Sequence, residues 1–331
     1  MAIQKTQPAR TSYRGRLAPS PTGLLHVGHA RTFWTASQRA RDAGGTLILR
    51  MDDLDPERSR PEYAEAAIED LRWLGIRWQE GPDKGGELGP YQQSKRLPHY
   101  EAALHKLIRR GFVYPCRCSR RDLLRSALAP HESRSNYGSA GHAMQLRGAD
   151  LRGAESHGAD MRSIDTDDEP IYPGTCRTFD VELAQLPGPT SARLLPQNVN
   201  WRFRVPDGVP VEFVDQNLGP QRFVAGVDFG DFLVWRRDHV PSYQLASTVD
   251  DGMMEISEVV RGADLLKSTA RQILLFRALG YAAPNWFHCD LVLDHNGQRL
   301  AKRHDALALR TLRQRGRTPM NILSAAMPTM G

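Results

Sequence analysis

Apolar and polar positions along the first third of the chain follow the periods of helices and buried strands. Residues 46–51, Thr-Leu-Ile-Leu-Arg-Met, form a short apolar run after two glycines, which predicts a buried parallel strand. Helical patterns precede it over residues 30–43 and follow it over residues 61–75 and 98–110. This alternation predicts an α/β fold with a doubly wound parallel sheet, whose ligands bind at the carboxyl ends of the strands.

The alternation is lost from residue 112 to about 214, which predicts a subdomain inserted into the sheet domain. We then expect a flexible tail over residues 1–14, the first half of the sheet domain over residues 15–111, and its second half with a short helical end over residues 215–331. Within the insertion, residues 126–169 are rich in Gly, Ala, Ser, His and Asp, and a flexible loop is expected there.

Composition narrows the class of protein. Lys and Arg number 44 against 38 Asp and Glu, which gives a net charge of +6 and a pI near 9.3, and a basic surface attracts polyanions. Hydrophobic residues make up 40% of the chain, enough for a sizeable core, but no run approaches the roughly 20 apolar residues of a membrane span. Four cysteines without an apolar secretion signal favour a reducing compartment, so we expect a cytoplasmic protein.

The strongest chemical signal lies in residues 16–31, which combine a strand end, a turn rich in proline and glycine, and a helix start with two histidines. Backbone N–H groups and the positive dipole end at such a start favour phosphate. Gly28 lacks the Cβ that would occupy the space of a ring or phosphate. Alone, His26 or His29 would be an ordinary solvated side chain. In this setting each can donate to phosphate oxygens as charge builds on them, which predicts a nucleotide pocket.

Residues 26–29, His-Val-Gly-His, resemble the HIGH signature of class I aminoacyl-tRNA synthetases in the form used by the glutamyl branch. Four further segments resemble blocks of that family in the family's order: residues 50–58, 241–251, 258–266 and 299–303, the last at the place of the KMSKS loop. The resemblance implies the Rossmann-like catalytic domain of that class. It also implies a ligase that uses ATP with Mg2+ to activate an amino acid.

The length of the chain and the short stretch after Lys302 predict a catalytic domain with an insertion and no anticodon-binding domain. This arrangement is similar to the glutamyl-Q tRNA(Asp) synthetases. The resemblance implies activation of L-glutamate as glutamyl-adenylate, transfer of glutamate to the queuosine base in the anticodon loop of tRNA(Asp), and a monomer. Two alternatives stay open: a truncated glutamyl-tRNA synthetase that charges a tRNA 3′ end, and a non-catalytic paralogue that binds tRNA or nucleotide.

Glutamate carries an ammonium group and two carboxylates, so a specific pocket needs an acidic residue and fixed guanidinium groups that bind carboxylates. By resemblance, the glutamate contacts fall on Arg16, Ala18, Ser20, Asp52, Tyr243 and Arg261. Asp52 stands where the family usually has Glu, so the acid is one methylene shorter. A second interpretation of Asp52 and Asp53 is that they cap the next element.

By resemblance, the ATP contacts fall on His26, Gly28, His29 and Lys302, with both histidines and the lysine as catalytic residues. Lys302 belongs to the segment Arg-Leu-Ala-Lys-Arg, in which Ala301 replaces the serine of the KMSKS consensus. A mobile ammonium there stabilises charge on departing pyrophosphate more than it stabilises ground-state ATP, and Mg2+ would share this task. The alternative is an ordinary solvated basic loop.

Four residues of the insertion resemble the structural zinc ligands of many glutamyl-Q enzymes: Cys116, Cys118, Tyr172 and Cys176. Two thiolates one residue apart can share a tetrahedral ion, and a closed site with four ligands is structural. The alternative is a set of buried thiols without metal. Three histidines of the expected loop are competing ligands: His131, His142 and His157. Cys289 is expected to be a packed thiol.

Overall fold

The computed structural model describes residues 12–119, 122, 171–178, 198–292 and 308–326. Its larger sheet has six strands in the order β2-β1-β8-β9-β5-β6. These strands are β1 (Arg14–Leu17), β2 (Thr46–Leu49), β5 (Pro210–Asp215), β6 (Gly219–Val224), β8 (Glu258–Gly262) and β9 (Asn285–Cys289). Neighbouring strands are parallel except β5 and β6, which form an antiparallel hairpin at one edge. The predicted parallel sheet is therefore confirmed, with an antiparallel edge added.

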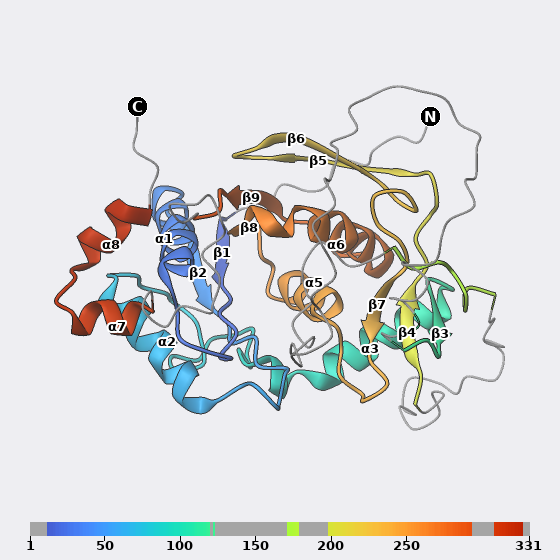
Figure 1. Ribbon diagram of the computed structural model, residues 1–331, viewed down its shortest axis with the longest axis horizontal. Helices are drawn as coiled ribbons and strands as arrows, with labels where there is room; N and C mark the ends of the chain where they lie inside the picture. Colours follow the sequence, from blue (N-terminus) through green and yellow to red (C-terminus); the bar gives the residue numbers. More distant parts are fainter. Residues whose placement is uncertain (1–11, 120–121, 123–170, 179–197, 293–307, 327–331) are drawn as a thin grey trace, which may run out of the picture.

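The three helices predicted in the first part of the chain are present as α1 (Val27–Asp42), α2 (Pro61–Trp73) and α3 (Leu97–Arg109). Helix α1 lies beside β1 and β2 and packs against both (Figure 1). It begins three residues before the predicted segment, because the side chain of His26 caps its amino end. A short 3-10 helix, η1 (Gln93–Lys95), directly precedes α3.

The second part of the chain supplies α5 (Tyr243–Met253), the 3-10 turn η5 (Ala263–Leu265), α6 (Leu266–Leu279), α7 (Leu309–Gln314) and α8 (Pro319–Ala326). The last two form a helical end that packs on α1 and α2. In the part of the chain that the structure covers, none of the helices has both the length and the apolar character that a membrane crossing requires.

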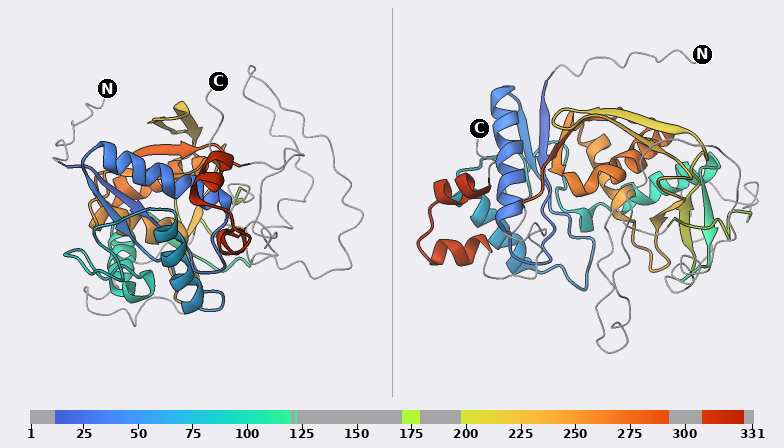
Figure 2. Two further views of the ribbon diagram at one scale, coloured as in Figure 1. Left: turned by 90° about the vertical axis from the view of Figure 1, so that its left-hand side faces the viewer. Right: turned by 45° about the horizontal axis from the view of Figure 1, so that its top comes forward.

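A second sheet of three antiparallel strands contains β3 (Val113–Cys116), β4 (Asn200–Phe203) and β7 (Phe232–Trp235), in the order β3-β4-β7. It lies at the opposite end of the molecule from α7 and α8 (Figures 1 and 2). The boundary expected at residue 214 falls inside β5, which belongs to the larger sheet, while β7 beyond that boundary pairs with β4. The tail expected over residues 1–14 overlaps β1, which begins at Arg14 because this residue pairs with Thr46 of β2 in the parallel register.

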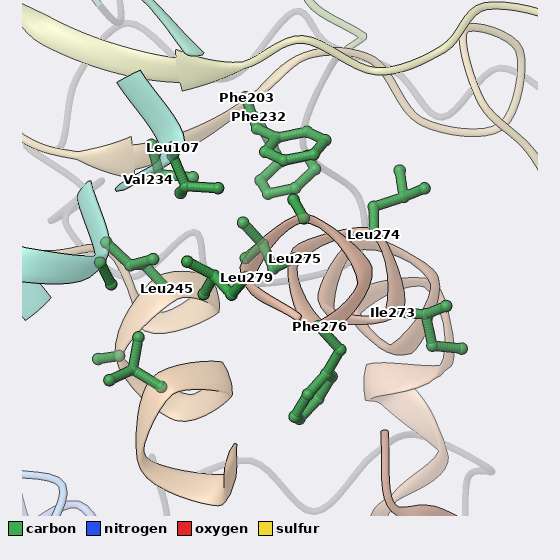
Figure 3. Packing of buried hydrophobic residues seen from close by; sticks show 14 of the residues in the cluster. Leu107, Phe203, Phe232, Val234, Leu245, Ile273, Leu274, Leu275, Phe276 and Leu279 are labelled. Carbon is green, nitrogen blue, oxygen red and sulfur yellow. The ribbon is translucent and has the colours of Figure 1, made fainter. Parts of the chain in front are cut away.

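Helix α6 lies at the centre of the main hydrophobic core (Figure 3). Its apolar side chains, Leu275 and Leu279 among them, pack with residues of α5 and of the smaller sheet, where the rings of Phe203 and Phe232 stack at 5.2 Å. A helix buried on nearly all sides is usually apolar throughout. In α6, however, Thr269 and Gln272 are polar and buried, and they face the site described next.

Candidate active site

The carboxyl ends of the parallel strands gather the basic residues predicted to bind substrate. Arg16 lies near the end of β1 and Arg261 near the end of β8, and these strands are neighbours in the sheet. Both side chains are 5% exposed. Helix α1 starts after β1. Tyr243, the first residue of α5, also reaches the site, because its hydroxyl accepts from Arg261 at 3.3 Å. The sheet therefore brings together groups that are more than 200 positions apart in the sequence.

The two histidines of the nucleotide motif cap helix α1 with their own rings. Nδ1 of His26 accepts from the backbone N–H of Gly28 at 3.1 Å, and Nδ1 of His29 accepts from the backbone N–H of His26 at 3.2 Å. A Cβ on residue 28 would lie 3.0 Å from Cε1 of His26, so glycine leaves room for the ring. Because each Nδ1 accepts a hydrogen bond, the proton of each neutral ring lies on Nε2.

A buried network of ion pairs lies behind Arg16. The guanidinium of Arg50 is fully buried and donates to Asp52 and to Asp251, each at 2.7 Å. Asp251 also accepts from Arg16 at 3.3 Å, and Arg16 donates in addition to the carbonyl of Val260 at 3.2 Å. Although burial raises the pKa of Asp251, the guanidinium groups of Arg16 and Arg50 hold it below its usual value. The network therefore fixes the orientation of Arg16.

The neighbouring carboxylate of Asp250 accepts from a second set of buried donors: Gln93, Arg96 and Tyr100. Together the two sets contain three carboxylates and three guanidinium groups: those of Asp52, Asp250 and Asp251, and those of Arg16, Arg50 and Arg96. Buried charges of both signs are thus matched here, which removes most of the cost of burying them. Arg261 makes no ion pair within this network, although Asp251 attracts it at longer range.

Asp52, the predicted partner of the substrate ammonium, has a side chain that is 8% exposed, and its carboxylate accepts a hydrogen bond from Arg50. Burial raises the pKa of Asp52 to about 6, against the opposing effect of Arg50. Asp53 accepts from the backbone N–H and the hydroxyl of Ser94 at 2.8 and 2.7 Å and so fastens η1. Neither Asp52 nor Asp53 caps α2, the next helix along the chain, which begins without a side-chain cap.

Arg261 is a buried cation whose hydrogen-bond partners are all neutral. It donates to His288 at 3.2 Å and to the hydroxyl of Tyr243, and three further donations reach the backbone of η5 and two polar side chains of α6. No carboxylate in the part of the chain that the structure describes lies within 4.0 Å of its guanidinium group. Burial lowers the pKa of Arg261, because the charged form is desolvated. A buried cation in this setting is stabilised by an anion that enters the site.

Sequence reasoning missed the pair of side chains behind Arg261. His288 of β9 lies directly opposite Arg261 of β8, and its Nδ1 is 2.6 Å from Oδ2 of Asp215 at the end of β5. Both side chains are buried. Burial and the charge of Arg261 lower the pKa of His288 to about 4, so its ring is neutral at pH 7. The available signal was a histidine in the short apolar strand Asn-Trp-Phe-His-Cys, where a polar residue interrupts a buried run.

Of the remaining predicted site residues, the structure describes Ala18 and Ser20 but not Lys302. Ala18 and Ser20 follow β1 in the turn before α1, where Ser20 is exposed and its carbonyl accepts from Thr22 at 2.8 Å. Lys302 and Ala301, in the segment that resembles the KMSKS loop, lie outside the described residues. So do the three histidines considered as competing metal ligands and the loop expected over residues 126–169.

The four predicted metal ligands come together next to the smaller sheet. The Sγ atoms of Cys116, Cys118 and Cys176 all lie within 4.8 Å of one another, and the hydroxyl of Tyr172 is 3.4 Å from Cys116 and 3.5 Å from Cys118. Cys118 and Cys176 are 3.5 Å apart. Two thiolates on one tetrahedral zinc ion lie about 3.8 Å apart, given Zn–S bonds of about 2.3 Å. The donor set therefore fits such an ion. Cys289 is buried in β9, as expected for a packed thiol.

A parallel sheet whose first helix starts with paired histidines agrees with the class I aminoacyl-tRNA synthetases, which the sequence motifs resemble. Residues 12–159 and 191–328 match the family described as tRNA synthetases class I (E and Q), catalytic domain. The chain belongs to this family.

Two relatives of known name are similar to nearly the whole chain. The chain is 45% identical over 312 residues to a glutamyl-Q tRNA(Asp) synthetase of Symbiobacterium thermophilum, covering 93% of this chain and 84% of the relative. It is 44% identical over 309 residues to one of Nitratidesulfovibrio vulgaris, covering 93% and 83%. Among solved structures, a glutamate tRNA ligase from Elizabethkingia meningosepticum in complex with its amino acid superposes with a TM-score of 0.66 at 27% identity. That match covers 88% of this chain and 52% of the ligase chain, so the chain spans about half of that structure.

Proposed function

We propose that this chain activates L-glutamate with ATP as glutamyl-adenylate and transfers the glutamate to queuosine in tRNA(Asp). The observation that carries the proposal is Arg261, a buried cation with neutral partners at the carboxyl edge of the sheet, next to a second buried arginine, Arg16. A substrate carboxylate supplies the missing counter-charge. The two relatives that carry the glutamyl-Q name support the choice of acceptor.

Side chains of different charge bind different groups of the two substrates, glutamate and ATP. Arg261 and Arg16 bind carboxylate groups of glutamate through fixed guanidinium planes. Asp52 receives the ammonium group as a second cation beside Arg50. The two histidines and the amino end of α1 donate to the phosphates of ATP, with the ring N–H of each histidine on Nε2. The chain thereby holds the nucleophile and the nucleotide in one orientation.

In the first step, a carboxylate oxygen of glutamate forms a bond to the α-phosphorus while the bond from that phosphorus to the bridging oxygen breaks, and pyrophosphate leaves with the electron pair. Lys302 lowers the energy of this step by its positive charge. Mg2+, when bound to ATP, neutralises part of the same charge. In the second step, a nucleophile of queuosine attacks the activated carbonyl carbon and AMP leaves.

We also propose that the four-residue cluster near the smaller sheet holds one structural zinc ion through Cys116, Cys118, Tyr172 and Cys176. Three thiolates and one phenol oxygen would fill all four positions of a tetrahedral site, so the ion would be structural and would not bind substrate. The ion would tie β3 to the segment that contains Tyr172 and Cys176, which lies more than 50 positions away in the sequence.

Transfer of radiolabelled glutamate tests the function. Purified chain is incubated with ATP, labelled glutamate and tRNA(Asp) that either carries or lacks queuosine. We expect label in the queuosine-containing tRNA(Asp) alone. Label on tRNA(Glu) would instead support a conventional glutamyl-tRNA synthetase that charges the 3′ end. Absence of glutamate-dependent ATP–pyrophosphate exchange would support a non-catalytic binding protein.

A further inference from the structure

Three buried side chains form a row across three adjacent strands of the larger sheet: Asp215 on β5, His288 on β9 and Arg261 on β8. Arg261 and His288 are partners in the strand register, and their side chains meet at 3.2 Å between Nε and Nε2. Asp215 is fixed in turn, since its Oδ1 accepts from the backbone N–H groups of Asn217 and Leu218 at 3.0 and 2.9 Å. Each member of the row is therefore oriented by the next.

The chemistry of the donors determines where the proton of the histidine lies. An arginine Nε–H can only donate, so Nε2 of His288 must accept from Arg261. The single proton of the neutral ring then lies on Nδ1, where it donates to Oδ2 of Asp215 at 2.6 Å. If the ring carried its proton on Nε2, that N–H would face the Nε–H of Arg261 and would turn to Oγ1 of Thr269, 3.1 Å away, so Arg261 would lose its hydrogen bond to the histidine. A carboxylate at position 215 stabilises the tautomer that Arg261 requires.

We propose that Asp215 and His288 are positioning residues of the glutamate site: Asp215 selects the Nδ1-protonated tautomer of His288, which holds the guanidinium plane of Arg261 toward a substrate carboxylate. The inference deepens the proposed function and rests on it. Trp286 supports the same plane from one side, with its ring centroid 5.0 Å from Cζ of Arg261. Because neither Asp215 nor His288 acts on the reacting atoms, the pair affects glutamate affinity and leaves the rate of the chemical step nearly unchanged.

The test is Asp215→Asn, a change of one atom. The amide oxygen stays with the backbone N–H groups of Asn217 and Leu218, so the amide nitrogen faces Nδ1 of His288 and donates to it. The ring proton then moves to Nε2, against the Nε–H of Arg261. We expect the glutamate Kd to rise roughly tenfold or more, while the single-turnover rate of adenylate formation at saturating glutamate stays within about threefold. Nitrogen-15 spectra of labelled histidine should show the ring proton on Nδ1 in the wild type and on Nε2 in the variant.

A matched control is Tyr13→Phe, which also removes a hydrogen bond to a carboxylate on strand β8, the 2.7 Å bond to Glu258, but at the far end of the strand from Arg261. Its glutamate Kd should equal that of the wild type. Should Asp215→Asn fail to fold, His288→Gln and His288→Phe replace it. The glutamine amide can donate to Asp215 and accept from Arg261, so it should keep the affinity within about threefold, whereas phenylalanine should lose it.

The possible outcomes separate this inference from the proposed function. A wild-type protein that does not bind glutamate would overturn the proposed function and this role with it. Normal wild-type binding, combined with a reversed tautomer and an unchanged Kd in Asp215→Asn, would overturn the positioning role alone. So would a wild-type ring with its proton on Nε2, or equal affinities of the glutamine and phenylalanine variants.

Discussion

Replacing Arg261 with methionine tests the central feature of the site. Methionine keeps an unbranched side chain of similar reach beside Trp286 but removes the charge and all hydrogen-bond donors. In the free protein, this change removes a buried cation that has neutral partners, and it leaves acceptors such as Oε1 of Gln272 and Oγ1 of Thr269 without their donor. These two effects on stability have opposite signs. In the complex with glutamate, by contrast, a buried carboxylate loses its partner outright.

The magnitude follows from the burial of the pair. Arg261 is 5% exposed, so a carboxylate bound to it is screened little by water. Truncating one partner of a buried, hydrogen-bonded charge pair costs about 2 to 5 kcal/mol. The glutamate Kd of Arg261→Met should therefore rise by roughly 30-fold to several thousandfold. Arg261→Lys keeps the charge but offers three donors in place of five, so its affinity for glutamate should lie between those of the wild type and Arg261→Met.

Calorimetric titration with L-glutamate measures the dissociation constants, and thermal unfolding with and without glutamate provides a second measurement. Glutamate at about 100 times the wild-type Kd should stabilise the wild type by about 2.7 kcal/mol and Arg261→Met by less than about 1 kcal/mol. Arg39→Met is the matched control, because Arg39 also donates to a carboxylate, Glu258 at 2.7 Å, and stacks on an aromatic ring at 4.3 Å, but lies outside the site. A Kd of Arg261→Met within threefold of the wild-type value would refute the assignment of this arginine to the substrate carboxylate.

Three further predictions concern the loop, the metal and acid stability. Lys302→Ala should slow single-turnover adenylate formation with little change in glutamate Kd, because its charge acts on departing pyrophosphate; an unchanged rate would exclude this lysine from the chemical step. Elemental analysis should find about one zinc per chain, and Cys118→Ser should lower both the zinc content and the melting temperature; metal-free protein prepared without chelator would contradict the site. His288, with its pKa lowered to about 4, makes stability fall as the pH falls from about 6.5 to 4, since the unfolded chain binds more protons in that window. Asp52, with its pKa raised to about 6, acts in the opposite direction between about pH 4 and 6, because there the folded chain binds more protons than the unfolded chain. In Asp52→Asn, the unfolding free energy measured by urea titration should therefore fall more steeply with decreasing pH. An equal pH dependence in the variant and the wild type would show that Asp52 is ionised throughout.

Local patterns predicted much of the first part of the fold. Helix α2 begins at Pro61 as expected, and Gly75 follows its end with φ at +81°, a conformation that glycine adopts without strain. The predicted start of α1 was three residues late, because ring nitrogens of His26 and His29 act as caps in place of the usual Ser, Thr, Asp or Asn. The antiparallel hairpin of β5 and β6 was also not predicted, since β5 falls almost entirely in the region where the alternation of helices and strands is lost and no helix separates it from β6.

The sequence by itself predicted the sheet class and the helix that follows the first strand, because each is encoded by a local period. It indicated the two arginines and the four residues of the cysteine cluster through the family resemblance of short motifs. Only the tertiary structure decided what surrounds Arg261. Asp215 and His288 belong to no motif, and they are separated from each other by more than 70 positions. They meet because β9 lies between β8 and β5 in the sheet, and α6 packs against β5 from a distant part of the chain. The proton on Nδ1 of His288, and with it the direction of the Arg261 guanidinium, depends on that contact, which no spacing along the chain can express.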